Sequence, residues 1–473
     1  MERKKRFTWS NSIGRESSTP LLYAIPETLE DICTIIKEAE AGKLKVRAVG
    51  AGHSFNDIAI TQDYMLSMEK LTNVQRVDKN LLRQKWKDYL GNIGDVNKNK
   101  QEFIEIESGI RLRALNATLD KDFGLALCNM GGIDHQSISG VVSTGTHGTG
   151  INLPAFPGMV RALTLVAAGG KAYHIEPEDG ITDPSLYSNS KIILIQDDEI
   201  FHSVILGLGA MGIIYSIVLE VRPVHWMEEV KTLCKWSELK QELLNGSIFN
   251  DYKDPEYVKK GLNPLRKVRG IMFQINPYTT KDDHTCILVR HMDLDERGKL
   301  GLFDRIRNPL SGILSTRMFS AITYKVTLSL LNRRSKGTPK SIDGALKGLK
   351  DKRYINRCYK VLYQGFVYIK ERAYDCEFAF DRTTDNHVNA IDAICAKAEE
   401  MKDKYDLYQT SPLGMRFVKQ SKAYLSPEYQ KEAAYIDTPF LTETKATDTM
   451  LEDYQQIMLK HGGVPHWGKI NSI

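Results

Sequence analysis

The spacing of apolar positions in the first fifty residues predicts a helix followed by a strand. Between positions 26 and 41, apolar residues recur three and four positions apart, which is the pattern of a helix with one buried face. Gly42 ends that pattern, and residues 45–49 alternate as a strand does. The strand runs directly into the glycine turn Gly50-Ala51-Gly52.

Strands and helices are predicted together through the rest of the first half. A strand over 104–107 precedes a helix over 112–123 whose apolar residues share one face. Residues 161–167 and 171–175, separated by two glycines, favour a β-hairpin. A helix over 198–206 and a strand over 213–221 follow. We therefore expect an α+β architecture in this half.

Two other regions differ in pattern. Residues 73–101 are rich in lysine and asparagine and poor in apolar side chains, so we expect a surface insertion there. From 226 to 435, strands alternate with longer amphipathic helices such as 387–402, which indicates a second domain. A last helix is predicted over 448–461. A length of 473 residues is consistent with two or three domains.

Composition changes this interpretation little. Apolar residues make up 42% and charged residues 26% of the chain, as in ordinary soluble proteins. A net charge of +5 from 64 basic and 59 acidic residues gives no strong field, so we expect no nucleic-acid partner. No stretch reaches membrane-spanning length, and we expect no transmembrane segment.

The cysteines and the amino terminus indicate a cytoplasmic location. The seven cysteines are widely spaced, with no CxxC pair that could hold zinc, so we expect reduced thiols and no metal site. The amino terminus begins with basic residues and then turns polar, unlike a secretory signal.

The first candidate binding segment is RAVGAGHSF, residues 47–55. Small residues after a strand let backbone N–H groups approach a diphosphate. The glycine spacing is not that of a P-loop, and no lysine follows to reach a terminal phosphate. A tight structural turn is the other interpretation of these residues.

The second candidate is GGIDHQSISGVVSTGTHGTG, residues 131–150, which combines many glycines with serines and threonines. Such a run offers backbone donors and hydroxyls to a polar ligand, and two such loops suit a dinucleotide. A flexible linker is the alternative, although Ile138, Val141 and Val142 favour burial.

A third glycine pattern, Gly207, Gly209 and Gly212, matches GxGxxG. Its context is reversed, because a helix is predicted before these glycines and a strand after them. The nicotinamide-binding motif needs the strand first. We therefore expect no nicotinamide site here.

Taken together, RAVGAGHSF, STGTHGTG, LGLGAMGIIYSIVLEV and HWGK resemble the aldonolactone and alditol oxidase branch of the vanillyl-alcohol-oxidase flavoproteins. The resemblance covers nearly the whole chain, and HWGK is the most specific of the four segments. It implies a PCMH-type FAD-binding domain of two α+β subdomains over 16–225. A cap domain with an antiparallel sheet flanked by helices would follow over 226–440. Residues 441–473 would return to the flavin.

The resemblance also assigns the cofactor and its residues. FAD would be bonded covalently through a ring nitrogen of His53, or held without a bond beside it. The residues implied to line FAD are Val49, Gly50, Ala51, Gly52, His53, Ser54, Phe55, Gly131, Gly132, Ser137, Gly140, Thr144, Gly145, Thr146, His147, Ile213 and His466.

Arg416 and Lys469 match the family's catalytic cations, whose charge would stabilise reduced flavin and a developing alkoxide. The implied reaction transfers a hydride from the CH–OH group of a small alcohol, polyol or sugar lactone to flavin N5, without a metal. Gly131 beside the flavin favours molecular oxygen as acceptor, with hydrogen peroxide as product. A dehydrogenase using a quinone or cytochrome, and a degenerate flavin-binding protein, are the alternatives.

The sequence departs from the family at three points. Gly414 stands where the family has the glutamate of Glu-x-Arg, and Gly132 stands where polyol oxidases have serine. Since both residues normally contact substrate, other groups such as Tyr435 or Asp437 would have to read it. Relatives also continue beyond HWGK, so we expect either a dispensable last helix or a truncated chain.

Overall fold

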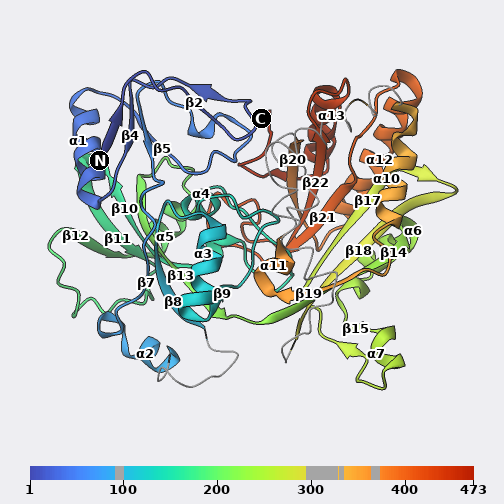
Figure 1. Ribbon diagram of the computed structural model, residues 1–473, viewed down its shortest axis with the longest axis horizontal. Helices are drawn as coiled ribbons and strands as arrows, with labels where there is room; N and C mark the ends of the chain where they lie inside the picture. Colours follow the sequence, from blue (N-terminus) through green and yellow to red (C-terminus); the bar gives the residue numbers. More distant parts are fainter. Residues whose placement is uncertain (91–100, 295–328, 330–334, 364–372, 473) are drawn as a thin grey trace. The chain divides into compact units, whose positions relative to one another are not determined.

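The computed structural model describes residues 1–90, 101–294, 329, 335–363 and 373–472. The chain forms two compact units (Figure 1). Unit 1 comprises residues 1–147, 154–224 and 421–429, and unit 2 comprises residues 148–153, 225–420 and 430–473.

The first sheet of unit 1 has the strand order β1(Glu2–Lys4), β4(Leu22–Ile25), β6(Tyr64–Ser67), β5(Val46–Val49). Strands β4 and β5 both pair with β6 in parallel. Helix α1(Leu29–Ala41) buries Ile32, Ile35, Ile36 and Ala39 in a core shared with this sheet. Full burial of an isoleucine side chain contributes about 1.5–3 kcal/mol. The predicted helix and strand of this region are confirmed.

The second sheet of unit 1 is larger and mostly antiparallel. Its order is β12(Ile192–Gln196), β11(Lys171–Glu176), β10(Val160–Ala167), β13(Ile213–Pro223), β8(Glu102–Glu107), β7(Val74–Arg76), and β9(Leu125–Leu127) also pairs with β13. Helices α3(Leu112–Thr118) and α5(Asp198–Val204) lie in the same unit. The predicted hairpin is β10 with β11, and the strands at 104–107 and 213–221 are β8 and β13. The predicted α+β architecture is confirmed.

The predicted surface insertion at 73–101 is wrong for its described part. Strand β7 extends the larger sheet by pairing with β8, and α2(Gln84–Leu90) follows it. Leu82 and Leu90 are buried in one cluster with Phe103 and Val218. A few apolar residues suffice, because Leu82 and Leu90, with Val77 and Trp86 beside them, join the core of the sheet. Residues 91–100 lie outside the described residues.

Unit 2 is built on an eight-stranded antiparallel sheet. Its order is β19(Arg353–Arg357), β14(Trp226–Lys235), β18(Asp283–Leu294), β17(Gly270–Thr280), β21(Leu413–Val418), β22(Ala433–Leu441), β20(Ala373–Asp381), β23(Val464–Pro465). Helices α6(Trp236–Leu244), α10(Thr338–Lys347), α12(Asn386–Tyr405) and α13(Thr447–Lys460) contact its strands. The predicted alternation of strands and longer helices is confirmed.

The two faces of this sheet differ near β20. The Cys376 thiol lies 4.0 Å from the carbonyl oxygen of Leu451 in α13, so this face of β20 is the helix-covered one. Because side chains alternate along a strand, Asp375 and Glu377 lie on the opposite face. That face carries the polar groups described below.

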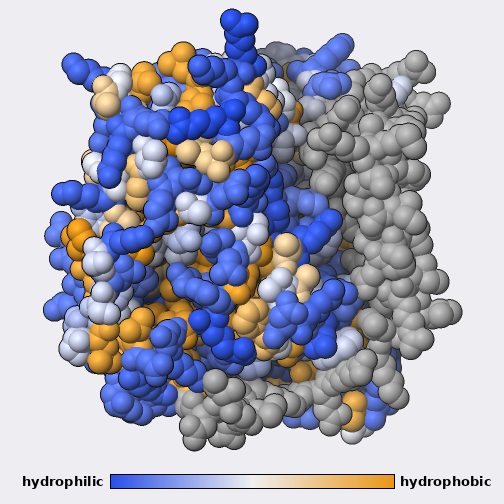
Figure 2. Space-filling view, turned by 60° about the vertical axis from the view of Figure 1, so that its left-hand side comes forward, coloured by the Kyte–Doolittle hydropathy of each residue, from blue (hydrophilic) through white to orange (hydrophobic). Residues whose placement is uncertain are grey.

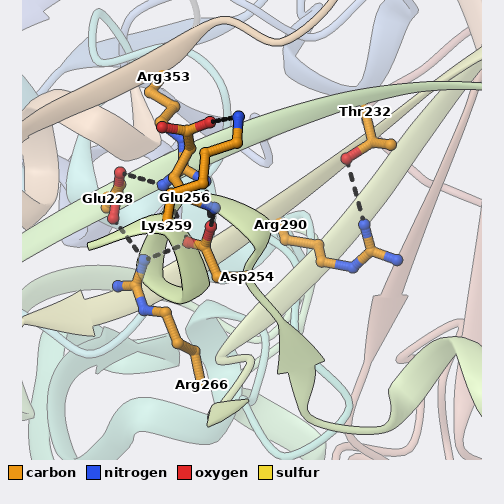
Figure 3. A network of polar contacts seen from close by, with 8 residues as sticks. All are labelled: Glu228, Thr232, Asp254, Glu256, Lys259, Arg266, Arg290 and Arg353. Carbon is orange, nitrogen blue, oxygen red and sulfur yellow. Dashed lines mark hydrogen bonds and ion pairs between the residues drawn. The ribbon is translucent and has the colours of Figure 1, made fainter. Parts of the chain in front are cut away.

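A buried ion-pair network fastens an excursion of unit 2 to its sheet (Figure 3). The excursion consists of β15(Tyr252–Lys253), α7(Pro255–Lys259) and β16(Leu265–Arg266). Asp254, which is fully buried, accepts hydrogen bonds from Arg266 at 3.3 Å and Arg353 at 2.9 Å. Glu228 of β14 accepts from the same two guanidinium groups. Two carboxylates and two guanidinium groups thus balance in charge, and all but the half-buried Arg353 are buried.

The surface is that of an ordinary folded protein. Figure 2 shows a face on which hydrophilic positions predominate and hydrophobic ones form smaller areas among them. No helix in the described parts of the chain is long and apolar enough to cross a membrane. None of the seven cysteines, all of which lie within the described residues, forms a disulfide; four are buried and three are half-buried.

Candidate functional site

The first predicted loop, which follows β5, is fixed to the amino-terminal segment of unit 1. Gly52 has a φ of +68°, which favours glycine, and its carbonyl accepts a hydrogen bond of 2.7 Å from the Ser12 amide. The Asn11 side chain donates to the Ser54 carbonyl at 3.0 Å. The turn is therefore held in one conformation by residues some forty positions earlier in the chain.

His53 lies half-buried in this loop. Its Nδ1 is 3.1 Å from the Ser12 hydroxyl, and its ring is nearly parallel to that of His135 with centroids 6.4 Å apart. The contact with Ser12 fixes the orientation of the imidazole. Nothing in the sequence motif pointed to Ser12, because the contact depends on how the amino-terminal segment folds back.

The second predicted loop contains a short helix, α4(Ile138–Ser143), whose apolar residues Ile138, Val141 and Val142 are fully buried. This burial excludes the flexible-linker interpretation. The Thr146 amide donates to the Val141 carbonyl at 2.9 Å, and Gly145 has a φ of +73°. Residues 131–147 of this run are thus an ordered part of unit 1.

The two loops meet within unit 1. A Cβ added to Gly50 would lie 1.9 Å from the Ser137 hydroxyl oxygen, and one added to Gly140 would lie 3.0 Å from it. The Ser137 hydroxyl is buried and has no hydrogen-bond partner among the described residues. Glycines that leave space around an unsatisfied hydroxyl fit the polar tail of a dinucleotide such as FAD.

Each of the two loops carries further predicted FAD residues. These are Val49, Ala51, Ser54 and Phe55 in the first loop, and Gly131, Gly132, Thr144, Thr146 and His147 in the second. Val49, Gly131, Thr146 and His147 are buried, and the rest are half-buried. A Cβ added to Gly131 would lie 3.0 Å from the Thr146 methyl carbon, so Gly131 packs closely on its own loop.

The third glycine pattern has the context predicted for it. Helix α5 precedes the glycines and β13 follows them, which is the reverse of a nicotinamide-binding motif. Gly212 has a φ of +145°, and a Cβ there would overlap Leu165. The glycine therefore serves packing between β13 and β10, and Ile213, next in the chain, is buried.

In unit 2, the HWGK segment lies along β20. The His466 amide donates to the Glu377 carbonyl at 2.8 Å, and the Ile470 amide donates to the Asp375 carbonyl at 3.0 Å. Lys469 consequently forms a close ion pair with Asp375, and its ammonium is 3.7 Å from Glu377. Asp375 and Glu377 are functional candidates that the sequence did not reveal.

The pKa values of both members of this ion pair, Asp375 and Lys469, are raised above their ordinary values. Burial raises the pKa of Asp375 to about 7, Lys469 opposes that shift, and the nearby carboxylates of Asp437 and Glu377 add to it. Burial acts to lower the pKa of Lys469, but Asp375 and Glu377 outweigh it, so the net shift is upward. Lys469 therefore stays positively charged at neutral pH.

Arg416, the other predicted cation, lies on the same face of the sheet. It pairs across β21 and β22 with Tyr435, and the adjacent row pairs Gly414 with Asp437. Asp437 in turn pairs with Glu377 of β20. Directly paired residues share a face, so Arg416, Asp437 and Glu377 project from the face opposite the helices.

His466 supports the turn that presents Lys469. Its Nδ1 accepts a hydrogen bond of 3.0 Å from the Gly468 amide, and its ring lies beside Tyr435 with centroids 6.4 Å apart. The side chain is buried. Its predicted contact with FAD stays a prediction.

Comparison with known proteins places these observations in a family. Residues 20–176 match a model described as an FAD binding domain, and residues 282–472 match one described as D-arabinono-1,4-lactone oxidase. An L-gulonolactone oxidase from Scyliorhinus torazame is 28% identical, over 99% of this chain and 90% of its own length. An L-gulono-1,4-lactone dehydrogenase from Mycobacterium tuberculosis is 25% identical, over 98% and 89%.

Among solved structures, a solvent-stable cholesterol oxidase has the same fold, with a TM-score of 0.64 at 14% identity over 99% of this chain and 87% of its own. Fold and matches together define the protein as an FAD-linked oxidoreductase. More narrowly, its carboxy-terminal domain match and its named relatives make the chain similar to aldonolactone oxidases, in agreement with the resemblance found in the sequence.

Proposed function

We propose that the protein oxidises the CH–OH group of a sugar lactone, holds FAD covalently through His53, and passes the electrons to molecular oxygen. The observation that carries the proposal is the meeting of Gly50 with the unsatisfied Ser137 hydroxyl, on a chain that also matches the lactone oxidase domain. The relatives' names supply the substrate class.

The chain's own residues have distinct roles in this proposal. When bound, FAD supplies a hydride acceptor. Lys469 and Arg416 supply positive charge to the substrate oxygen as its proton leaves. The loops around Gly50 and Ser137 hold the dinucleotide tail.

His53 is proposed as the covalent attachment point because Ser12 orients its ring within the first loop. The bond forms as one hydrogen leaves the imidazole nitrogen and one leaves the 8α-methyl carbon, with oxygen as the final electron acceptor. His147, in the second loop, is the other histidine in these loops that aligns with the family's FAD residues, and it is buried.

The test of attachment compares wild type with His53→Ala and His147→Ala after acid denaturation and gel electrophoresis under ultraviolet light. We expect flavin fluorescence on the wild-type and His147→Ala bands and none on the His53→Ala band. Fluorescence that persists in His53→Ala would reject the proposed attachment.

The substrate test mixes the purified protein anaerobically with L-gulono-1,4-lactone, D-arabinono-1,4-lactone, a polyol and a simple alcohol. Bleaching near 450 nm by a lactone supports the proposal, and bleaching by none of them rejects it. Admitting oxygen then measures reoxidation.

A dehydrogenase is the second candidate, because several relatives carry that name. Slow reoxidation by oxygen combined with fast reoxidation by a quinone would favour it. We also propose a cytoplasmic location, since seven cysteines without a disulfide suit a reducing compartment. Fractionation of cells that produce the protein tests this.

A further inference from the structure

Gly414 owes its small size to a neighbouring carboxylate. A Cβ added to Gly414 would lie 2.2 Å from Oδ1 of Asp437, 2.7 Å from its carboxylate carbon and 2.8 Å from Oδ2. Real Cβ atoms do not approach other atoms this closely. The Asp437 carboxylate therefore occupies the space that a side chain at 414 would take.

The register of the sheet explains this proximity. Gly414 pairs directly with Asp437 across β21 and β22, and with Gln274 across β21 and β17. Asp437 continues the row to Glu377 on β20. The row thus places two acidic side chains and one amide on the face that carries Arg416.

The charges on this face call for hydrogen-bond donors. Asp375, Glu377 and Asp437 are each more than nine-tenths buried, and Lys469 lies against the first two. An ionised carboxylate only accepts hydrogen bonds. A ligand with several hydroxyl groups supplies O–H donors to such a surface, whereas a hydrocarbon alcohol supplies one.

We propose that Asp437 is a specificity-determining residue that hydrogen-bonds a hydroxyl of a polyhydroxylated substrate. Gly414 leaves the space in which the Asp437 carboxylate lies. This inference rests on the proposed oxidation of a sugar lactone. A site that hydrogen-bonds a substrate hydroxyl discriminates strongly against analogues that lack this hydroxyl, because they lose that hydrogen bond.

Three variants test the inference in the flavin-loaded enzyme. Asp437→Asn removes the charge. Gly414→Ala keeps Asp437, but its added methyl group displaces the Asp437 carboxylate. An exchange variant combines Gly414→Glu with Asp437→Gly, which returns a carboxylate to β21. Asp381→Asn, at the far end of β20 and bonded to Thr383, is the matched control.

The measurement is the ratio of kcat/KM for D-arabinono-1,4-lactone to that for cyclopentanol, with flavin content and thermal midpoint recorded for each variant. We expect Asp437→Asn and Gly414→Ala to lower the ratio roughly 10- to 100-fold, mainly through KM for the lactone. The exchange variant should recover part of the loss, and Asp381→Asn should keep the wild-type ratio.

Two failures are distinguishable. If wild-type flavin is reduced by no lactone, the proposed function falls and this inference falls with it. If the wild type oxidises the lactone and Asp437→Asn keeps the ratio within about twofold, the role of Asp437 is wrong while the proposed function stands. A merely structural role would lower the thermal midpoint and both substrates' kcat/KM together.

Discussion

Replacing Gly50 by alanine adds one methyl group between the two loops proposed to hold FAD. The new carbon would lie 1.9 Å from the Ser137 hydroxyl oxygen and 3.0 Å from the Ser137 Cβ. Since non-bonded heavy atoms rest about 3.5 Å apart, the oxygen must move by about 1.6 Å. The hydroxyl has no partner among the described residues that would resist this movement.

The free energy of unfolding should fall by about 0–2.6 kcal/mol, an amount comparable to the expected loss in FAD binding. Overpacking costs about 1–3 kcal/mol, and the loss of glycine's freedom in the unfolded chain offsets about 0.4–1 kcal/mol of that cost. A hydrogen bond from the hydroxyl to a charged phosphate is worth about 1.5–3 kcal/mol. Displacing Ser137 should therefore weaken FAD binding roughly 10- to 150-fold.

The assay uses protein in which His53 is also replaced by alanine, so that FAD binds reversibly. Titration of apoprotein with FAD gives the dissociation constant, and thermal unfolding without FAD gives the stability change. Ser137→Ala removes the hydroxyl without adding bulk and should reproduce most of the loss in affinity. Gly344→Ala, in α10, is the control, because a Cβ there meets nothing within 4 Å.

Unchanged FAD affinity in Gly50→Ala, together with a folded protein, would refute the argument that these loops form the cradle. A loss in Gly50→Ala but none in Ser137→Ala would show that the space matters and the hydroxyl does not.

Three other predictions follow from the same structure. Asp254→Asn should lower the free energy of unfolding by about 3–5 kcal/mol in urea titrations, because it leaves the buried charge of Arg266 with one carboxylate, that of Glu228, which it shares with Arg353, and a loss below about 1 kcal/mol would contradict this. Burial acts to raise the pKa of Glu229, but His291 and Lys231 outweigh burial and lower this pKa to about 2. The ionised Glu229 therefore stabilises the fold by about 3 kcal/mol above pH 4.5, and this stabilisation is lost as the pH falls toward 2. Glu229→Gln should flatten that pH dependence of the thermal midpoint, and an unchanged slope would count against the ion pair. Gly131→Ala should slow reoxidation of the reduced flavin by oxygen at least about tenfold in stopped-flow measurements without slowing reduction by lactone, and equal rates would argue against oxygen access at this position.

The sequence predicted those elements whose apolar residues repeat at a clear period. Helix α1, which buries one face, and strand β13, which is buried along most of its length, are examples. Strand β7 was missed because it has only three residues, and its partly buried pattern does not distinguish an edge strand from a loop. The order of the eight strands in unit 2 also lay beyond the sequence, because most pairing partners there, apart from β17 with β18 and β21 with β22, are far apart along the chain.

For the candidate site, motifs identified the groups but not their partners. The motif around His53 gives no sign of Ser12, and HWGK gives no sign that Lys469 meets Asp375. Both contacts join segments that are distant in the chain and are set by tertiary folding. Short motifs report which side chains can react, whereas their orientation and charge depend on such contacts.

Gly414 shows why a missing motif residue within a sheet is weak evidence of lost chemistry. Residues paired across two antiparallel strands have Cβ atoms about 4.5–5.5 Å apart, so a carboxylate on either strand can serve the same point in space. Here the carboxylate that the family carries on the strand of Gly414 is absent, and that of Asp437 fills the space above the glycine. A side chain at 414 would lie within 2.2 Å of the Asp437 carboxylate, so an acidic residue at both positions would not fit in this arrangement. Selection at the two positions should therefore act on the pair, with one carboxylate and one small residue, and the exchange variant tests that coupling directly.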